Sequence, residues 1–343
     1  MKEALVDVSV LILFFNRPDM LERLFAEIRK ARPARLFLYQ DGPRSEADMP
    51  RMLACRRVVE DIDWECEVHR MYRTENYGCD PSNFMSQKWA FSITDKCIVL
   101  EDDDVPTMSF FHFCKDMLDR YADDPRVTMI EGFNVDEETP DVAEDYFFTT
   151  HFSIWGWASW RRVIDQWDEH YTWLDDPQTV AQLEQLIRER GYRDDFLEMC
   201  RKHRAQGKAF YESIFWSHLM MTNGLCIMPR RNLLNNMGVT SDSTHFGGSL
   251  ETLPRGYRRI FTMRRLEMDT YTKGTPLRHP HHMMEHLPYR HRAYRTMGWM
   301  CPWVKVGRSL EELYLNLRHG NLAYIGRAIS NRWMKMTGRK RYD

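Results

Sequence analysis

The chain has 343 residues, with 48 Lys and Arg against 50 Asp and Glu, so its formal net charge is −2. Apolar residues make up 43% of the chain and charged residues 29%, a globular composition that excludes an intrinsically disordered chain. The near-neutral charge also argues against a nucleic-acid-binding protein, since such proteins are usually basic. The charge is nevertheless uneven. Residues 287–343 carry twelve Lys or Arg and three acidic residues, which makes this segment +9 and the rest of the chain −11.

The length, the cysteines and the apolar runs predict a cytoplasmic protein with no membrane span. A chain of this length predicts one large domain with an appendage, or two domains. The eight cysteines include no CxxC pair, as expected of reduced thiols in the cytosol. The longest early apolar run, residues 8–15, is too short to cross a bilayer and lacks the flanks of a signal peptide.

Strand and helix patterns alternate through the first 135 residues. Residues 8–15 form a continuous apolar run, typical of a strand buried on both faces, and Pro18 then suits the first turn of a helix. Further strands are predicted at residues 35–40, 64–68, 96–100 and 126–130, and further helices at residues 45–62, 80–93 and 110–121. This alternation predicts an α/β fold with a mostly parallel sheet and helices on both faces.

The pattern is less regular after residue 136. The sequence predicts a Trp-rich loop or short strand at residues 151–160, a short strand at 225–228, and helices at 177–190, 194–206 and 310–317. We therefore expect a main domain over residues 1–255 and a basic, partly helical C-terminal extension over residues 256–343.

Polar residues follow each of the first four predicted strands. They are, in chain order, Asn16 and Arg17, then Asp41, then Asn76 and Gly78, then Glu101, Asp102, Asp103 and Asp104. Ligands of open α/β sheets bind in the crevice at the carboxyl ends of the strands, so we expect these side chains to gather around one ligand. Strand-to-helix turns are rich in Asn, Asp and Gly in any case, so a purely structural role stays open for Asn76, Gly78 and Asp41.

The acidic quartet at residues 101–104 is the strongest local signal. Four adjacent carboxylates repel one another and raise each other's pKa unless a cation compensates them. Carboxylate oxygens suit Mg²⁺ or Mn²⁺, which take their remaining ligands from water and phosphate oxygens. Such an ion would neutralise charge on a leaving diphosphate. The alternative is a solvated acidic turn.

Two segments together resemble the GT-A-fold glycosyltransferases. They are VSVLILFFNRPD at residues 8–19 and LEDDDVP at residues 100–106, with Phe110 and Phe111 just beyond. The resemblance is to bacterial family-2-like enzymes and to the related N-acetylglucosaminyltransferases that make N-glycan branches. It implies a GT-A, Rossmann-like nucleotide-diphospho-sugar transferase domain whose acidic motif is a version of DXD.

The resemblance also implies roles for the polar residues. The last carboxylate of the motif ligates the metal in that family, which corresponds to Asp103, while Glu101 and Asp102 would face ribose and sugar. Because Asp104 adds a fourth acid, the register of this assignment stays open by one residue. An Asp after the second strand meets the uracil base in this fold, which implies Asp41.

The segment SIWGWASWRRV at residues 153–163 is similar to a Trp-Gly-Trp segment of the bacterial enzymes. In the family it lies under the sugar and the acceptor. Gly156 would permit close backbone approach, and the flat faces of Trp155, Trp157 and Trp160 suit sugar C–H groups. A core aromatic cluster is the alternative. We expect one or two of the three rings in the core and either Trp155 or Trp157 in contact with ligand.

Two later segments extend the resemblance to residue 248. Glu212, in FYESIFW at residues 210–216, occupies the place of the family's general base, although the usual residue there is Asp. Glu198, Asp194 and Asp195 are the alternative bases. The segment from residue 223 to 248 is similar to the family's closing segment, which ends in Thr-His and implies that His245 contacts metal or phosphate.

Two features of the C-terminal extension stay outside the resemblance. His282, Glu285 and His286 match the H-x-x-E-H zinc-peptidase pattern, but Pro280 and Pro288 leave too little room for the required helix. With His279, His281 and His291 nearby, a polar surface segment or an adventitious metal-binding segment is the favoured interpretation. The basic tail has three interpretations, namely packing on the acidic body, peripheral binding to anionic membrane lipid, and nucleic-acid binding, which is the weakest.

Taken together, the resemblance implies a metal-dependent, inverting hexosyl- or N-acetylhexosaminyltransferase that uses Mn²⁺ or Mg²⁺. Its donor would be a nucleotide sugar, with UDP favoured, and its acceptor a glycan or a lipid-linked glycan in surface polysaccharide synthesis. The expected location is the cytoplasm or the inner face of the cell membrane. The alternatives are a sugar nucleotidyltransferase, disfavoured because residues 14–18 are not Gly-rich, and a catalytically silent sugar- or nucleotide-binding module.

Overall fold

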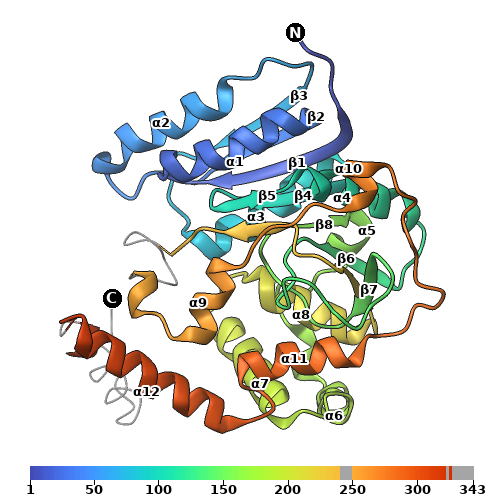
Figure 1. Cartoon of the computed structure of the whole chain (residues 1–343). Helices are drawn as coiled ribbons and strands as arrows, with labels where there is room; N and C mark the ends of the chain where they lie inside the picture. The colour runs from blue at the N-terminus through green and yellow to red at the C-terminus, as the bar shows by residue number, and fades with distance from the viewer. Residues whose placement is uncertain (240–248, 322–323, 327–343) are drawn as a thin grey trace.

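The computed structural model describes residues 1–239, 249–321 and 324–326. An eight-stranded mixed sheet forms the centre, with the strand order β3-β2-β1-β4-β8-β6-β9-β7, and helices cover its faces (Figure 1). Neighbouring strands are parallel except where β8 pairs with β4 and β6 and where β7 pairs with β9. The α/β class with a mostly parallel sheet flanked by helices is therefore confirmed.

The strands of the large sheet are β1 (Val6–Phe14), β2 (Pro33–Gln40), β3 (Glu67–Tyr72), β4 (Lys96–Glu101), β6 (Val127–Glu131), β7 (Tyr146–Thr149), β8 (Trp157–Trp160) and β9 (Leu225–Pro229). A second sheet pairs β5 (Asp104–Pro106) with β10 (Leu234–Asn236). The α-helices are α1 (Pro18–Ala31), α2 (Met49–Glu60), α3 (Cys79–Ile93), α4 (Met108–Arg120), α5 (Arg161–Ile164), α6 (Pro177–Leu186), α7 (Arg190–Gln206), α8 (Tyr211–Met221), α9 (Arg255–Thr262), α10 (Asp269–Lys273), α11 (Leu287–Met297) and α12 (Pro302–Arg318).

Four of the five strands predicted in the first 135 residues lie within two residues of their observed positions. The third does not, because β3 begins at Glu67, after the predicted start at residue 64. Trp64 is buried, but its indole N–H donates to the carbonyl oxygen of Pro33 at 2.9 Å and its ring packs on Phe25. The alternation around Trp64 therefore reflects packing under α1, and β3 itself is a half-exposed edge strand.

The central strand β8 comes from the Trp-rich segment, which the sequence left open as a loop or a short strand. It runs antiparallel between β4 and β6, and all four of its residues are buried. The sequence did not predict β7, β5 or β10, which are short and pair with partners far away in the chain.

The chain order of the strands reverses between β1 and β4, which are parallel neighbours. Helices after β1 and β2 lie on one side, and α3, which returns the chain from β3 to β4, lies on the other, as right-handed crossovers require. The register aligns Leu13 with Glu101, so the residues that follow β1 and β4 meet at the sheet edge. Such a reversal opens a crevice at the carboxyl ends of the strands, where ligands bind in this class of fold.

The described part of the C-terminal extension packs on the main body. Met263, Met268 and Tyr294 are buried in the main core cluster, and Glu285 forms a β-bridge with Phe148 of β7. None of the helices in the described ranges is both long and apolar enough to cross a bilayer.

Candidate functional site

A cleft of about 530 Å³ opens at the carboxyl ends of β1, β2 and β4 and beside the start of α3. Its walls include all seven residues that the sequence predicts for donor binding, namely Asn16, Arg17, Asp41, Asn76, Gly78, Glu101 and Asp102. They come from four strand ends spread over 87 residues of chain, and the parallel order of the strands brings them together.

Arg17 crosses from the end of β1 to the acidic quartet. Its guanidinium donates to the carboxylate of Asp102 through Nε at 3.4 Å and through a closer Nη2 contact, and its Nη1 lies 3.0 Å from Oδ2 of Asp103. Burial raises the pKa of Asp102 to about 6, although the charge of Arg17 opposes this shift. One arginine thus serves two largely buried carboxylates.

Asp104 has a structural role. It is fully buried, and its Oδ2 accepts hydrogen bonds from the backbone N–H groups of Glu101 and Gly156, each at 3.1 Å. Its Oδ1 accepts from Nδ2 of Asn236 at 3.2 Å. Asp104 therefore ties the acidic turn to the Trp segment and to β10. Of the four acids, Glu101 and Asp102 line the cleft, whereas Asp103 and Asp104 are not among its lining residues in the described structure.

Asp103 is held between Arg17 and the segment that follows β10. Its Oδ1 accepts from Nδ2 of Asn236 at 3.0 Å, and its backbone carbonyl accepts from the N–H of Met237 at 2.8 Å. Gly238 passes so close that a Cβ there would lie 2.4 Å from Oδ2 of Asp103. Residues 236–238 thus position Asp103. His245, which the resemblance assigns to metal or phosphate, lies outside the described residues.

The acidic turn holds more carboxyl groups than the neighbouring Arg17 can compensate. Arg17 compensates one charge of the quartet, and burial together with the neighbouring carboxylates raises the pKa of Glu101 well above its usual range. In the described ranges no three His, Cys, Asp or Glu side chains converge as a complete metal cage. Mg²⁺ and Mn²⁺ need only one or two protein carboxylates when substrate phosphates and water supply the rest. Glu101 lines the cleft and can supply such a carboxylate. Asp103 follows two residues later, with its two oxygens held by Arg17 and Asn236, and would supply a second one only by exchanging one of these contacts.

Asp41 clamps the loop between β3 and α3. Its carboxylate accepts hydrogen bonds from the backbone N–H groups of Tyr77 at 3.0 Å and Gly78 at 2.9 Å, and from Nδ2 of Asn76 at 3.0 Å. Gly78 has a φ of +85°, a conformation that favours glycine. These contacts shape the rim of the cleft and explain why Asp41, Asn76 and Gly78 lie together.

Unpaired polar atoms line the floor of the cleft. The hydroxyl groups of Tyr39 and Ser82 are buried and lie near each other, and neither these hydroxyls nor the Oδ1 atom of Asn83 has a hydrogen-bond partner elsewhere among the described residues. One turn further along α3, the fully buried amide of Gln87 likewise has no partner within the described chain. Buried polar atoms are normally paired, so a group of them on a cleft wall indicates a polar ligand or ordered water.

The sequence did not predict Tyr39, Ser82 and Asn83 as residues of the site. A signal was present, because Ser82, Asn83, Ser86 and Gln87 form a polar stripe at helical spacing on α3. Such a stripe normally faces solvent. Here all four residues are buried, because this face of α3 lies against the sheet.

Glu212 occupies the first turn of α8, beyond the rim of the cleft. It is partly exposed, and desolvation, with a smaller contribution from the charge of Asp80, raises its pKa to about 7. Its charge also contributes to the raised pKa values of Glu101 and Cys79, both of which line the cleft. A carboxyl group that titrates near neutral pH beside a cleft suits a general base.

The alternative bases face elsewhere. Asp194 and Glu198 are exposed on α7, and Asp195 accepts from the indole N–H of Trp299 and from Lys305. Like Glu212, none of the three lines the cleft in the described structure, but the charge of Glu212 acts on Glu101 and Cys79, which do line it.

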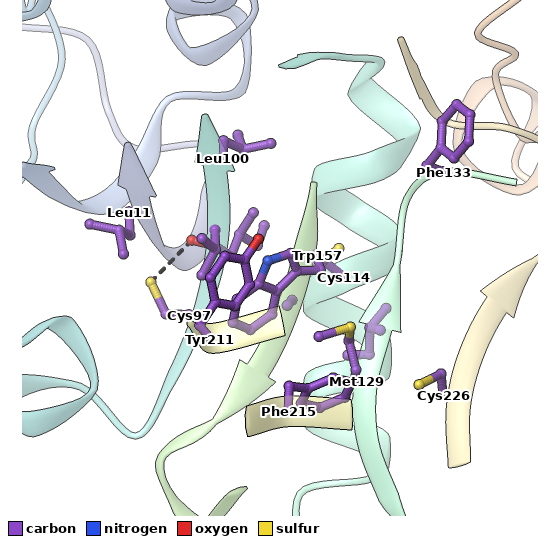
Figure 2. Packing of buried hydrophobic residues seen from close by; sticks show 14 of the residues in the cluster. Leu11, Cys97, Leu100, Cys114, Met129, Phe133, Trp157, Tyr211, Phe215 and Cys226 are labelled. Carbon is purple, nitrogen blue, oxygen red and sulfur yellow. Dashed lines mark hydrogen bonds between the residues drawn. The ribbon is translucent and has the colours of Figure 1, made fainter. Parts of the chain in front are cut away.

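The predicted sugar-binding residues are not among the described residues that line the cleft. Trp157 is buried and stacks on Tyr211, the first residue of α8, in the core drawn in Figure 2. Gly156, with a φ of +56°, packs against Leu234 so closely that a Cβ would lie 2.4 Å from a Leu234 methyl carbon. Trp155 is only partly buried, beside Phe133 and Phe261.

The zinc-peptidase pattern does not form a helix in the structure. Residues 282–286 precede α11, which begins at Leu287. Glu285 accepts from the backbone N–H of Thr150 at 3.0 Å and from Nη1 of Arg290 at 2.8 Å. This segment therefore joins the extension to β7.

Comparison with known proteins adds no family assignment. No protein-family model and no curated protein sequence matches the chain.

Proposed function

We propose that the chain is a metal-dependent, inverting glycosyltransferase of the GT-A fold. It would transfer a hexosyl or N-acetylhexosaminyl group from a nucleoside diphosphate sugar, with UDP favoured, to a glycan or lipid-linked acceptor in surface polysaccharide synthesis. The observation that carries the proposal is the convergence of seven predicted donor-binding residues, from four strand ends, on one cleft. The cleft lies where the strand order reverses, the usual place for a nucleotide in such sheets.

The residues of the cleft suit the parts of such a donor. Unpaired atoms of Tyr39, Ser82 and Asn83 can hydrogen-bond to the polar edge of a base or ribose. Glu101 and Asp103 would hold Mn²⁺ or Mg²⁺, which when bound neutralises charge developing on the leaving diphosphate. Arg17 holds Asp102 and Asp103 in place and adds a positive charge beside the phosphates.

Glu212 would act on the acceptor. Its carboxylate takes the proton from the acceptor hydroxyl as that oxygen bonds to the anomeric carbon and the bond from this carbon to the diphosphate oxygen breaks. A pKa of about 7 leaves a substantial fraction of Glu212 ionised at neutral pH while keeping it basic enough to accept a proton. Trp155, the least buried tryptophan of the segment, is the candidate contact to sugar or acceptor.

The test measures Mn²⁺-dependent turnover of a panel of nucleotide sugars by the wild type, Asp103→Asn and Glu212→Gln. We expect both variants to bind UDP and to lose transfer, by on the order of 100-fold or more for the base. Glu198→Gln and Asp61→Asn are matched controls, because both side chains are exposed away from the cleft. Full transfer activity in Glu212→Gln would place the base elsewhere.

The same panel separates the alternatives. A silent binding module would bind a nucleotide sugar without turnover in any variant. A sugar nucleotidyltransferase would consume a nucleoside triphosphate and a sugar phosphate and release pyrophosphate. If no sugar nucleotide is bound or turned over, the glycosyltransferase proposal fails.

A further inference from the structure

Helix α12 presents its apolar face to solvent. Trp303, Val306, Leu310, Leu313, Tyr314 and Leu317 recur at spacings of three and four residues and so share one face of the helix. All six are exposed, from 43% for Leu313 to 76% for Trp303. We call these six residues the α12 stripe. In Figure 1, α12 runs along the outside of the molecule.

The opposite face of α12 docks through polar contacts. Nη1 of Arg308 donates to the hydroxyl of Tyr257 at 2.7 Å, and its guanidinium lies over the same ring. Oε1 of Glu311 accepts from the backbone N–H of Arg255 at 3.1 Å. Nζ of Lys305, at the edge of this face, lies 2.6 Å from Oδ2 of Asp195 on α7. These contacts fix which way the helix faces and leave the stripe outward.

This orientation is the reverse of the usual one. Amphipathic helices on a protein surface bury the apolar face, because removal of apolar area from water is the main stabilising term. A contiguous exposed apolar patch of this kind marks an interaction surface. The stripe therefore requires an occupant.

The charge around the stripe favours one occupant. Residues 287–343 have a net charge of +9, and residues 319–342, which follow α12, contain six Lys or Arg and no acidic residue. A symmetric contact with a second copy would bring two such segments together, and the stripe spans only about two heptads, fewer than a coiled coil needs. Apolar side chains with Trp and Tyr beside clustered cations match the interface of an anionic bilayer.

We propose that the α12 stripe inserts into the headgroup region of an anionic phospholipid membrane and holds the cleft-bearing body at that surface. The apolar side chains of the stripe supply burial, and the cations of the C-terminal segment supply attraction to acidic headgroups. This inference rests on α12 and on the charge of residues 287–343, and it does not depend on the proposed glycosyltransferase activity.

The test is flotation of the full chain with vesicles of phosphatidylcholine, either alone or mixed with phosphatidylglycerol. We expect the wild type to float with the mixed vesicles and the double variant Leu310→Glu/Leu317→Glu to bind them on the order of tenfold or more weakly. Leu53→Glu, the same substitution at an exposed position on α2, is the matched control and should float like the wild type. All of these positions are exposed, so thermal unfolding should be nearly unchanged and UDP binding should be the same.

Three results would overturn the proposal. In the first, the double variant floats with the mixed vesicles as well as the wild type does. A second is failure of the wild type to float with the mixed vesicles. In the third, the wild type is a dimer that does not float and the double variant is a monomer. The stripe would then contact a second copy of the chain.

Discussion

The ring of Trp157 stacks on that of Tyr211, with centroids 6.2 Å apart and planes 20° from parallel. Trp157 lies at the centre of the sheet, in β8, and Tyr211 is the first residue of α8, immediately before Glu212. The stack therefore connects the strand between β4 and β6 to the helix start that carries the candidate base. A tryptophan that the sequence assigned to either ligand or core instead supports the site from behind.

Trp157→Ala should lower the free energy of unfolding by about 3–5 kcal/mol, because it removes a large buried side chain and leaves a cavity. Trp157→Phe should retain part of the stacking and lose less. Denaturant unfolding measures both. Trp303→Ala is the matched control, since Trp303 is 76% exposed and its loss should change stability by less than about 0.5 kcal/mol.

Glu212 should make stability fall as pH rises through neutrality. Its pKa is about 7 in the folded chain, against 4.5 for an ordinary Glu, so between these values the folded chain binds a proton that the unfolded chain has released. The stabilisation is complete below pH 4.5 and is lost as pH rises to 7. Glu212→Gln should therefore be more stable than the wild type at pH 8, by up to about 3 kcal/mol, and closely similar at pH 4.5.

Urea unfolding at the two pH values checks this prediction. Glu198→Gln, exposed on α7, should show no such pH-dependent gain. The transfer rate of the wild type should rise with pH through about 7, because the base must be ionised. A stability difference that does not change with pH would show that Glu212 titrates normally.

Tyr39→Phe should separate ligand binding from folding. Its hydroxyl is buried and, apart from the neighbouring hydroxyl of Ser82, has no partner in the described chain, so removing it should change the free energy of unfolding little. If the hydroxyl contacts the ligand, the Kd for UDP should rise roughly fivefold, which corresponds to about 1 kcal/mol. Calorimetric titration with UDP measures it.

Tyr146→Phe is the control for this change. The hydroxyl of Tyr146 shares hydrogen bonds with Tyr121 at 2.7 Å and His279 at 2.9 Å, far from the cleft lining. Its removal should cost about 1 kcal/mol of stability without altering the Kd for UDP. An unchanged UDP affinity in Tyr39→Phe would show that the floor of the cleft does not contact the donor.

Gly238→Ala should disturb Asp103 specifically. The new Cβ would lie 2.4 Å from Oδ2 of Asp103, an atom already held by Arg17. The carboxylate must move, so Mn²⁺ affinity, followed by electron paramagnetic resonance in the presence of UDP, should fall on the order of tenfold. Gly256→Ala, where a Cβ meets nothing within 4 Å, should bind Mn²⁺ like the wild type. Equal Mn²⁺ affinity in the two variants would show that Asp103 does not ligate the ion.

The position of the acidic turn could be predicted from the sequence, but the orientation of its side chains could not. The apolar run before Glu101 predicted a buried strand, and a strand of that kind delivers its following residues to the sheet edge whatever the rest of the chain does. Which acid faces inward was not predictable. Asp104 turns inward because β5 pairs with β10, about 130 residues further along the chain, and Asn236 then accommodates its carboxylate.

The same distinction applies to α3 and α12. Helical periodicity shows which residues share a face but does not show what that face meets. On α3 the polar stripe is buried, and two of its four residues, Ser82 and Asn83, line the cleft. On α12 the polar face docks and the apolar face remains outside, because Arg308, Glu311 and Lys305 find partners on neighbouring elements.

The sequence alone determined the α/β class, the position of most strands in the first half, and the polar residues that would meet at their carboxyl ends. These are local properties, set by hydrophobic periodicity and by the residues that terminate strands. The tertiary structure decided that β8 lies between β4 and β6, that Trp157 supports Glu212, and that Asp104 serves the fold. These outcomes depend on contacts between distant segments, whose energies no local pattern contains.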